Sequence, residues 1–222
     1  MERYDIINSL IRKKGFTKYL EVGVRDPSVC FDKIECKYKH SVDPGLDIGN
    51  GVNLASYKLT SDDFFLKLKL GELDHDKNHK WDLIFIDGLH LADQVYRDFL
   101  NSSEHLSENG FIVFHDANPP TIQHAREIAE DFSTLAGSEW NGTVWKAIQK
   151  IRTNPKNMRG DEYSLITVDS DWGVSVLWKG KSKTLFNPEI NPFYEYESFS
   201  QNRTEILNLI SVSDFKSWIN RM

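Results

Sequence analysis

The chain has 222 residues, of which 40% are hydrophobic and 27% charged, and its formal net charge is -6. This length and composition are typical of a single globular domain with a sizeable core. The acidic balance argues against a nucleic-acid partner bound mainly through its phosphates. The chain begins without the basic and apolar pattern of a signal peptide and has no membrane-spanning apolar run. We therefore expect a cytoplasmic protein, not inserted in a membrane, whose two cysteines are reduced thiols.

Apolar periodicity and turn residues predict alternating helices and strands along the chain. The expected elements are, in order, a helix at 2–14, a strand and its exit at 17–23, a short helix at 27–34, a strand at 38–42, a polar loop at 47–55, a brief strand at 56–59, a helix at 60–68, a charged connector at 73–80, a strand at 82–86, a helix from 92 that Asn109-Gly110 ends, a strand at 111–114, helices at 121–135 and from about 147 to 152, strands at 164–168 and 174–178, and helices at 205–210 and 214–222.

The stretch from Trp81 to Pro120 is predicted to form a strand, a crossover helix and a parallel strand. Its first strand ends at Asp87 and His90, and its second at His115 and Asp116. Ligands of open parallel sheets bind at the carboxyl ends of the strands. Two carboxylates and two imidazoles there can bind a divalent cation, move a proton, or do both. The alternative is that the carboxylates only cap helices and shape loops.

A second set of residues follows the first two predicted strands. Gly23, after Glu21, lets a ligand approach the backbone closely, and Asp43 comes 20 residues later. An acid at that distance commonly accepts hydrogen bonds from a nucleoside ribose. Ser61 and Asp62 could reach an adenine, although helix capping explains both residues without a ligand.

Two tryptophans, Trp140 and Trp145, flank an Asn-Gly-Thr turn. They predict either a wall or lid over a pocket, or core aromatics beneath a loop. The sequence favours neither reading.

Together these motifs resemble the class I S-adenosylmethionine (SAM)-dependent methyltransferases. The matching features are Glu21-Val22-Gly23 after the first strand, Asp43 after the second, Asp87, and the strand from Gly110 to Asp116. The resemblance implies a Rossmann-like, mostly parallel seven-stranded α/β sheet with helices on both faces and a C-terminal antiparallel hairpin. It also implies one domain, with a leading helix (1–15), a core (16–178) and a C-terminal extension (179–222).

The segments Phe85–His90 and Phe114–Asp116 resemble a narrower group, the small O-methyltransferases of sugar and antibiotic biosynthesis, several of which are magnesium-dependent. This resemblance implies that Asp87 and Asp116 bind Mg²⁺ and that His90 is the catalytic base. The chain departs from the group in two places. Arg25 stands where a second glycine is expected, and it could pair with the cofactor's carboxylate. Ala117 separates Asp116 from Asn118, which leaves the third metal ligand open.

The predicted function is SAM-dependent O-methylation of a small hydroxylated acceptor, a sugar or nucleotide-sugar, with Asp87 also near the cofactor. Three alternatives use the same fold: an NAD-dependent oxidoreductase, a metal-dependent hydrolase, and a non-catalytic nucleotide-binding partner of a larger assembly. The oxidoreductase is disfavoured because G-x-G-x-x-G is missing. A metal-dependent hydrolase would not need Asp43 at a ribose-binding position. We also allow for a homo-oligomer.

Overall fold

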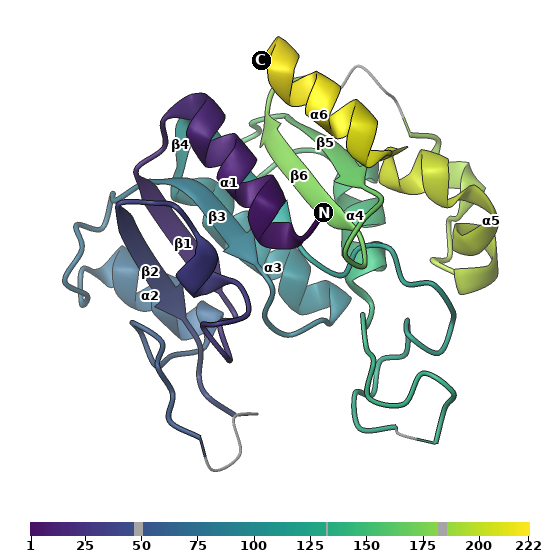
Figure 1. Ribbon diagram of the computed structural model, residues 1–222, viewed down its shortest axis with the longest axis horizontal. Coiled ribbons are helices and arrows are strands. Elements are labelled where there is room, and N and C mark those ends of the chain that lie inside the picture. Colours follow the sequence, from purple (N-terminus) through teal and green to yellow (C-terminus); the bar gives the residue numbers. More distant parts are fainter. Residues whose placement is uncertain (47–50, 132, 182–185) are drawn as a thin grey trace.

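The computed structural model describes residues 1–46, 51–131, 133–181 and 186–222, which form a seven-stranded sheet in the order β2-β1-β3-β4-β6-β5-β7 (Figure 1). The strands are β1 (Lys18–Val22), β2 (Tyr38–Val42), β3 (Trp81–Ile86), β4 (Leu106–Phe114), β5 (Tyr163–Val168), β6 (Val174–Lys179) and β7 (Leu209–Ile210). The helices are α1 (Arg3–Lys14), α2 (Ser61–Leu70), α3 (Ala92–Glu104), α4 (Val144–Thr153), α5 (Tyr196–Leu207) and α6 (Val212–Arg221), with 3₁₀ turns at Phe31–Lys33 and Pro188–Ile190.

The first four strands of this order are parallel, and the expected C-terminal hairpin completes the sheet. β1 pairs in parallel with β2 and β3, and β3 pairs in parallel with β4. β6 is antiparallel to both β4 and β5, whereas the short β7 runs parallel to β5. The mostly parallel Rossmann-like sheet is therefore confirmed, and the C-terminal extension supplies its seventh strand.

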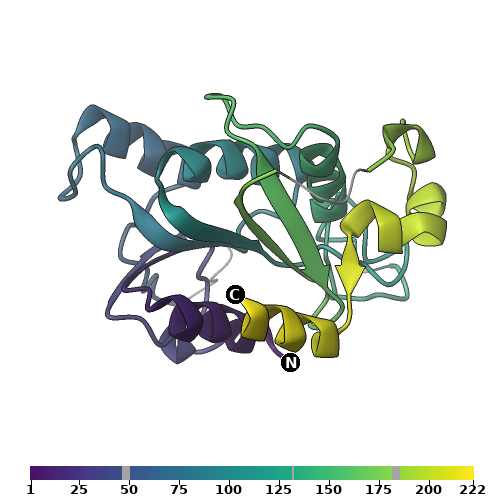
Figure 2. The same cartoon turned by 90° about the horizontal axis from the view of Figure 1, so that it is seen from above.

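Helices cover both faces of the sheet (Figure 2). α1 and α6 lie side by side on one face, where Ile6, Ile7, Leu10 and Phe215 are fully buried. α2, α3 and α4 cover the other face, whose core continues to Phe199 of α5. This arrangement explains the near-continuous apolar runs of β3 and β4, since both sides of each strand are buried.

Two expected elements are shorter than the sequence predicts. The strand at 56–59 is reduced to one parallel bridge between Tyr57 and Val42, because the chain leaves the sheet edge at once for α2. The helix at 27–34 is reduced to the 3₁₀ turn Phe31–Lys33. Residues 47–50 of the expected polar loop lie outside the described residues.

The boundary between α3 and β4 also differs from the prediction. α3 ends at Glu104 with His105 as its C-cap, so Asn109-Gly110 does not stop the helix. These two residues lie inside β4, where the pairing with β3 shifts between Trp81 and Leu83. A bulge of this kind accommodates extra residues in one strand, and turn-forming Asn-Gly suits it. At the C-terminus the expected helix 205–210 is replaced by α5, which begins and ends earlier.

The predicted helix at 121–135 is wrong for the described residues of that segment, which form consecutive turns; residue 132 lies outside the described part. The cause is the guanidinium of Arg126. It donates hydrogen bonds to carbonyl oxygens along the loop, namely those of Gln123, Ile128, Ala129, Gly137 and Glu139. A helix would need some of these carbonyls for its own i→i+4 bonds, so the segment winds around Arg126 instead.

Across the described ranges, no helix combines the length and the apolarity that crossing a bilayer requires.

Candidate active site at the strand ends

Asp87 follows β3 and is held by a residue from the start of the chain. Arg3, in the first turn of α1, places Nη1 2.9 Å from Asp87 Oδ2 and Nε 3.0 Å from Asp171 Oδ2. Asp171 belongs to the β5–β6 turn and also accepts a hydrogen bond from the Arg3 backbone N–H at 2.7 Å. The leading helix is thus fixed to the rim by one guanidinium shared between two carboxylates.

His90 lies between the two carboxylates that were predicted to bind a metal. Its Nε2 is 3.4 Å from Asp87 Oδ1, and its Nδ1 is 3.2 Å from Asp116 Oδ2. The Trp140 ring stacks on the imidazole, with ring centroids 5.0 Å apart and an interplanar angle of 25°. Parallel pairing of β3 with β4 brings these groups together because both strands end at the same edge.

His115, the last histidine of the predicted cluster, is buried beneath the rim. Its Nδ1 lies 3.2 Å from both Asp87 Oδ1 and Asp116 Oδ2, and its Nε2 lies 3.3 Å from Asp171 Oδ1. The structure therefore places all four predicted rim residues in one cluster, to which Arg3 and Asp171 are added. The formal charges of three carboxylates are opposed by one guanidinium and two imidazoles.

These contacts shift the pKa values of both histidines. Burial by itself lowers the pKa of His90, but the hydrogen bond to Asp87 and the charge of Asp116 outweigh it, and the pKa is raised. Burial likewise opposes the charge of His115, yet Asp87 and Asp116 raise its pKa well above the ordinary value. The two carboxylates therefore favour the protonated form of His90 more than water does for a free imidazole. A divalent cation on the carboxylates would counteract this shift.

The side-chain amide of Asn141 contacts the oxygen of Asp116 that faces away from the two histidines. Asn141 Nδ2 donates to Asp116 Oδ1 at 2.8 Å, whereas its Oδ1 is buried without a hydrogen-bond partner among the described residues. A buried carbonyl oxygen without a donor is uncommon and indicates a missing cation or donor. Asn118, the amide that the sequence offered, points elsewhere, to Asp169 and Arg203.

Asp43 lies at the tip of β2 and shapes the loop after β1. Its Oδ2 accepts hydrogen bonds from the backbone N–H groups of Val24 at 3.0 Å and Arg25 at 2.9 Å. Its Oδ1 accepts one from Gly45 at 2.6 Å. A carboxylate has about four acceptor sites, so one remains for a ligand. Arg25 adopts a left-handed φ of 38° in this loop.

The glycine after β1 is required by the protein's own backbone. Gly23 has a φ of 87°, and a Cβ there would lie 2.2 Å from the carbonyl oxygen of Asp87. The tips of β1 and β3 are therefore in backbone contact. Glu21 is 2% exposed, and its Oε2 accepts a hydrogen bond from the Tyr19 hydroxyl at 2.5 Å. Burial raises the pKa of Glu21 to about 8.

The proposed adenine residues, Ser61 and Asp62, begin α2 and contact α3. Thr60, rather than either of them, is the N-cap of α2. Gln94 of α3 places Nε2 3.1 Å from Ser61 Oγ and 3.3 Å from Asp62 Oδ1. The helix contact therefore accounts for both side chains without a ligand.

The two tryptophans of the Asn-Gly-Thr turn have different roles. Trp140 stacks on His90 and forms a wall of the site, while Trp145 is 1% exposed and packs on Phe199 in the core. The core reading therefore holds for Trp145, whereas Trp140 covers His90. Gly142 makes this possible, since a Cβ there would lie 2.1 Å from the carbonyl oxygen of His90.

Sequence reasoning missed Arg3, Asp171 and the role of Asn141. Arg3 lies 84 residues from Asp87 in an ordinary amphipathic helix, so no local pattern marks it. Asp171 has a left-handed φ of 47° in the β5–β6 turn. The sequence of this turn is typical of a simple hairpin connection, so it gives no sign of a functional role. The only available signal for Asn141 was its place between the two tryptophans.

Comparison with known proteins identifies the fold. Residues 48–117 match a family model described as a methyltransferase domain. The SAH-bound methyltransferase PaMTH1 of Podospora anserina superposes with a TM-score of 0.52 at 14% identity, over 81% of this chain and 78% of that one. The chain has the class I SAM-dependent methyltransferase fold. The plantazolicin methyltransferase BpumL in complex with SAH gives a TM-score of 0.50 at 11% identity, over 80% of this chain and 84% of that one. No curated protein matches the sequence.

The family model supports a methyltransferase domain at residues 48–117, and at such low identity the structural similarities establish the fold alone. The chain's own residues also fit a cation. Ligand atoms of Asp87, His90 and Asp116 all lie within 4.8 Å of one another. Two carboxylates with an imidazole suit a divalent metal.

Proposed function

We propose that this protein is an O-methyltransferase that transfers the methyl group of SAM to a small hydroxylated acceptor, with assistance from a divalent metal. The observation that carries the proposal is the convergence of Asp87, His90 and Asp116 at the strand ends of a methyltransferase fold. Bound SAM supplies an electrophilic methyl group. The protein must then hold the acceptor oxygen in line and make it nucleophilic.

The cofactor is assigned to the tips of β1 and β2. Asp43 keeps one acceptor site for a ribose hydroxyl, and the loop that it holds includes Arg25, a candidate partner for the cofactor's carboxylate. Glu21 and Gly23 define the floor beneath that loop. Ser61 and Asp62 remain candidates for the adenine end, on the condition that Gln94 releases them.

Asp87 and Asp116 are the proposed metal ligands, and Mg²⁺ is the proposed ion. A bound metal would lower the pKa of an acceptor hydroxyl. Asn141 contributes by orienting Asp116 and by offering its unpartnered Oδ1. Arg3 neutralises the outer oxygen of Asp87 and leaves Oδ1 facing His90 and His115.

His90 is the proposed general base, and its neighbours orient the ring that would accept the proton. Trp140 fixes the plane of the imidazole, and the two carboxylates favour the proton that it accepts. The same ring also belongs to the group of side chains that could hold the metal. If His90 binds the metal, it cannot be the base, so kinetics of a His90 variant must decide between the two roles.

A hollow beside the cluster supports a hydroxyl-rich acceptor such as a sugar or nucleotide-sugar. It has a volume of about 270 Å³ and includes Asn118, Asp169, Asp171, Trp172 and Arg203 in its lining. Trp172 is 38% exposed and adopts a left-handed φ of 62°. Strained backbone is often found where a side chain must face a ligand. An aromatic face combined with amide and carboxylate groups fits a ring that carries several hydroxyls.

A cytoplasmic location is part of the proposal, on the basis of Cys30 and Cys36, which are both free thiols. Disulfides are rare in reducing compartments, and unpaired cysteines are normal there.

The decisive experiment measures binding and turnover together. Calorimetry with SAM, SAH and NAD tests the cofactor, and we expect binding of the first two but not of NAD. Acceptor candidates are then incubated with isotopically labelled SAM with Mg²⁺ or with a chelator. Binding of NAD without SAM would favour the oxidoreductase, and acceptor hydrolysis without methyl transfer would favour the metal-dependent hydrolase.

A further inference from the structure

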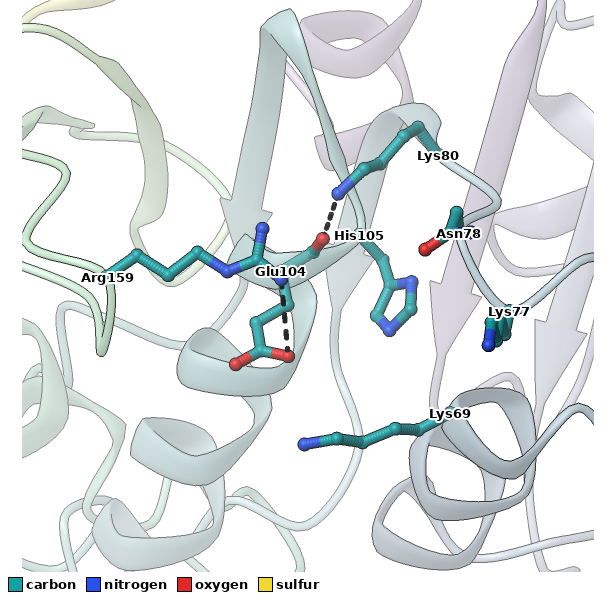
Figure 3. A pocket seen from close by; sticks show the side chains of 7 residues that line it. All are labelled: Lys69, Lys77, Asn78, Lys80, Glu104, His105 and Arg159. Atoms are coloured by element: carbon teal, nitrogen blue, oxygen red, sulfur yellow. Dashed lines mark hydrogen bonds and ion pairs between the residues drawn. The ribbon is translucent and has the colours of Figure 1, made fainter.

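A second hollow lies at the opposite edge of the sheet from the candidate active site. It has a volume of about 300 Å³ and is lined by Lys69, Lys77, Asn78, Lys80, Glu104, His105 and Arg159 (Figure 3). Four separate segments build it: the end of α2, the connector before β3, the end of α3, and the loop before β5. The sequence predicted only a charged connector at 73–80. Nothing in the methyl-transfer proposal uses this hollow.

The charge of its lining is strongly positive although the chain as a whole is acidic. Lys69, Lys77, Lys80 and Arg159 face a single carboxylate, that of Glu104. The C-termini of α2 and α3 also point here and together contribute about one negative charge. The sum of four cations, one carboxylate and two helix ends leaves about two positive charges uncompensated.

Contacts within the protein do not neutralise the charges of these four side chains. Arg159 Nη2 is 3.9 Å from Glu104 Oε2, which is a long ion pair, and Lys80 donates to the backbone carbonyl of Glu104. Lys69 and Lys77 make no ion pair within the described ranges of the chain. Capping the end of α3 explains Lys80 without a ligand, but it explains neither Lys77 nor Arg159.

His105 gives the hollow a buried polar floor. The residue is 7% exposed, and its ring lies among the lysine and arginine side chains in Figure 3. Its Nδ1 is 3.1 Å from the carbonyl oxygen of His79, which can only accept, so Nδ1 carries the proton. Nε2 is the ring nitrogen left for a ligand. Burial lowers the pKa of His105, and the charge of Lys80 adds to that effect.

We propose that this hollow is a binding site for a phosphate-class dianion, either free phosphate or a phosphomonoester. The charge balance calls for two negative charges, and ammonium and guanidinium groups are the usual partners of phosphate oxygens. The site is separate from the methyl-transfer chemistry. Lys80 precedes β3 and Asp87 follows it, and six strand residues span about 20 Å.

Calorimetric titration of the full chain with inorganic phosphate, glycerol 2-phosphate and pyrophosphate, at low ionic strength, tests the proposal. We expect saturable binding of at least one probe, weakened about tenfold or more in the Lys69→Gln/Arg159→Gln variant. Lys216→Gln, which removes one positive charge at an exposed position of α6, should leave the affinity unchanged. The order of affinity among the three probes then separates free phosphate from an ester or a diphosphate.

A second readout is local to the site. Histidine NMR should show that the bound probe raises the pKa of His105, since an adjacent dianion favours the imidazolium. Equal affinity in the Lys69/Arg159 and Lys216 variants would overturn the proposal, as would the absence of saturable binding up to about 10 mM probe. Both variants lie on the surface, so circular dichroism is sufficient to verify their folding.

Discussion

Arg3 and Asp87, 84 residues apart in the sequence, are joined by an ion pair of 2.9 Å between Nη1 and Oδ2. Because Asp171 shares the same guanidinium, this contact connects the first helix, the tip of β3 and the β5–β6 turn. The side chains of Arg3 and Asp87 are only 19% and 14% exposed, so solvent screens the interaction weakly.

We therefore expect Arg3→Gln to lower the free energy of unfolding by about 2–3 kcal/mol, because two carboxylates lose their charged partner in a partly buried site. Chemical denaturation measures the change. Arg12→Gln is the matched control, since Arg12 pairs with Glu35 at the surface and should cost below about 1 kcal/mol. Equal effects of the two changes would show that Arg3 does not stabilise the rim.

Asp43→Ala should weaken SAM binding by about 1–3 kcal/mol, because the ribose loses a hydrogen-bond acceptor and the loop of Val24 and Arg25 loses its anchor. Calorimetry on the folded variant provides the measurement. Asp32→Ala, on the exposed 3₁₀ turn, is the control for a lost negative charge. An unchanged dissociation constant for SAM would remove Asp43 from the cofactor site.

Asn141→Ala should weaken Mn²⁺ binding by about 10–100-fold, because Asp116 loses the amide that orients it and the site loses the oxygen of Asn141. Paramagnetic resonance of free Mn²⁺ measures the affinity. Asn118→Ala removes an amide that points to Asp169 and Arg203, so Mn²⁺ affinity should stay the same. Full activity of the wild-type protein in excess chelator would argue against a metal altogether.

His90→Ala should leave SAM binding intact and lower kcat by roughly 10²–10⁴-fold, the range expected for loss of a general base. His115→Ala should instead act mainly on stability, because His115 is 4% exposed and contacts three carboxylates. Steady-state kinetics and thermal unfolding of both variants separate the two roles. Near-normal turnover by the His90 variant would leave metal activation as the main source of nucleophilicity.

Asp98 is buried in α3, where Gln94 Nε2 donates a hydrogen bond to its Oδ1 at 3.0 Å. We expect this carboxyl group to make the stability of the protein depend on pH. Burial raises its pKa from 3.8 to about 6. The folded state therefore holds this proton more tightly than the unfolded state, and the contribution of Asp98 to stability falls as pH rises from about 4 to 6. Asp98→Asn should be more stable relative to wild type at pH 7 than at pH 4, by up to about 3 kcal/mol.

Denaturation curves of wild type and Asp98→Asn across this pH range test the expectation. Asp93→Asn, on the exposed side of the same helix, controls for the loss of a charge. A difference between Asp98→Asn and wild type that does not vary with pH would contradict the assignment.

The sequence alone predicted the strand, crossover helix and parallel strand that became β3, α3 and β4, and the edge of the sheet at which their polar side chains gather. Continuous apolar runs such as those of β3 and β4 occur where a sheet is covered on both faces, and parallel strands must end together. Asp87, His90, His115 and Asp116 could therefore be predicted as neighbours. The spacing between Gly23 and Asp43 indicated Asp43 as the ribose position, which remains a prediction.

Only the tertiary structure decided what surrounds these groups. Arg3 and Asn141 reach the cluster from segments far away in the chain, and a local pattern cannot report such contacts. Arg126 prevented an apolar, helix-like segment from forming a helix, because its guanidinium takes up the carbonyl oxygens of the loop. The upward shift in the pKa of His90 was likewise out of reach of the sequence, since it depends on distances of 3.2–3.4 Å to two carboxylates that folding alone brings together.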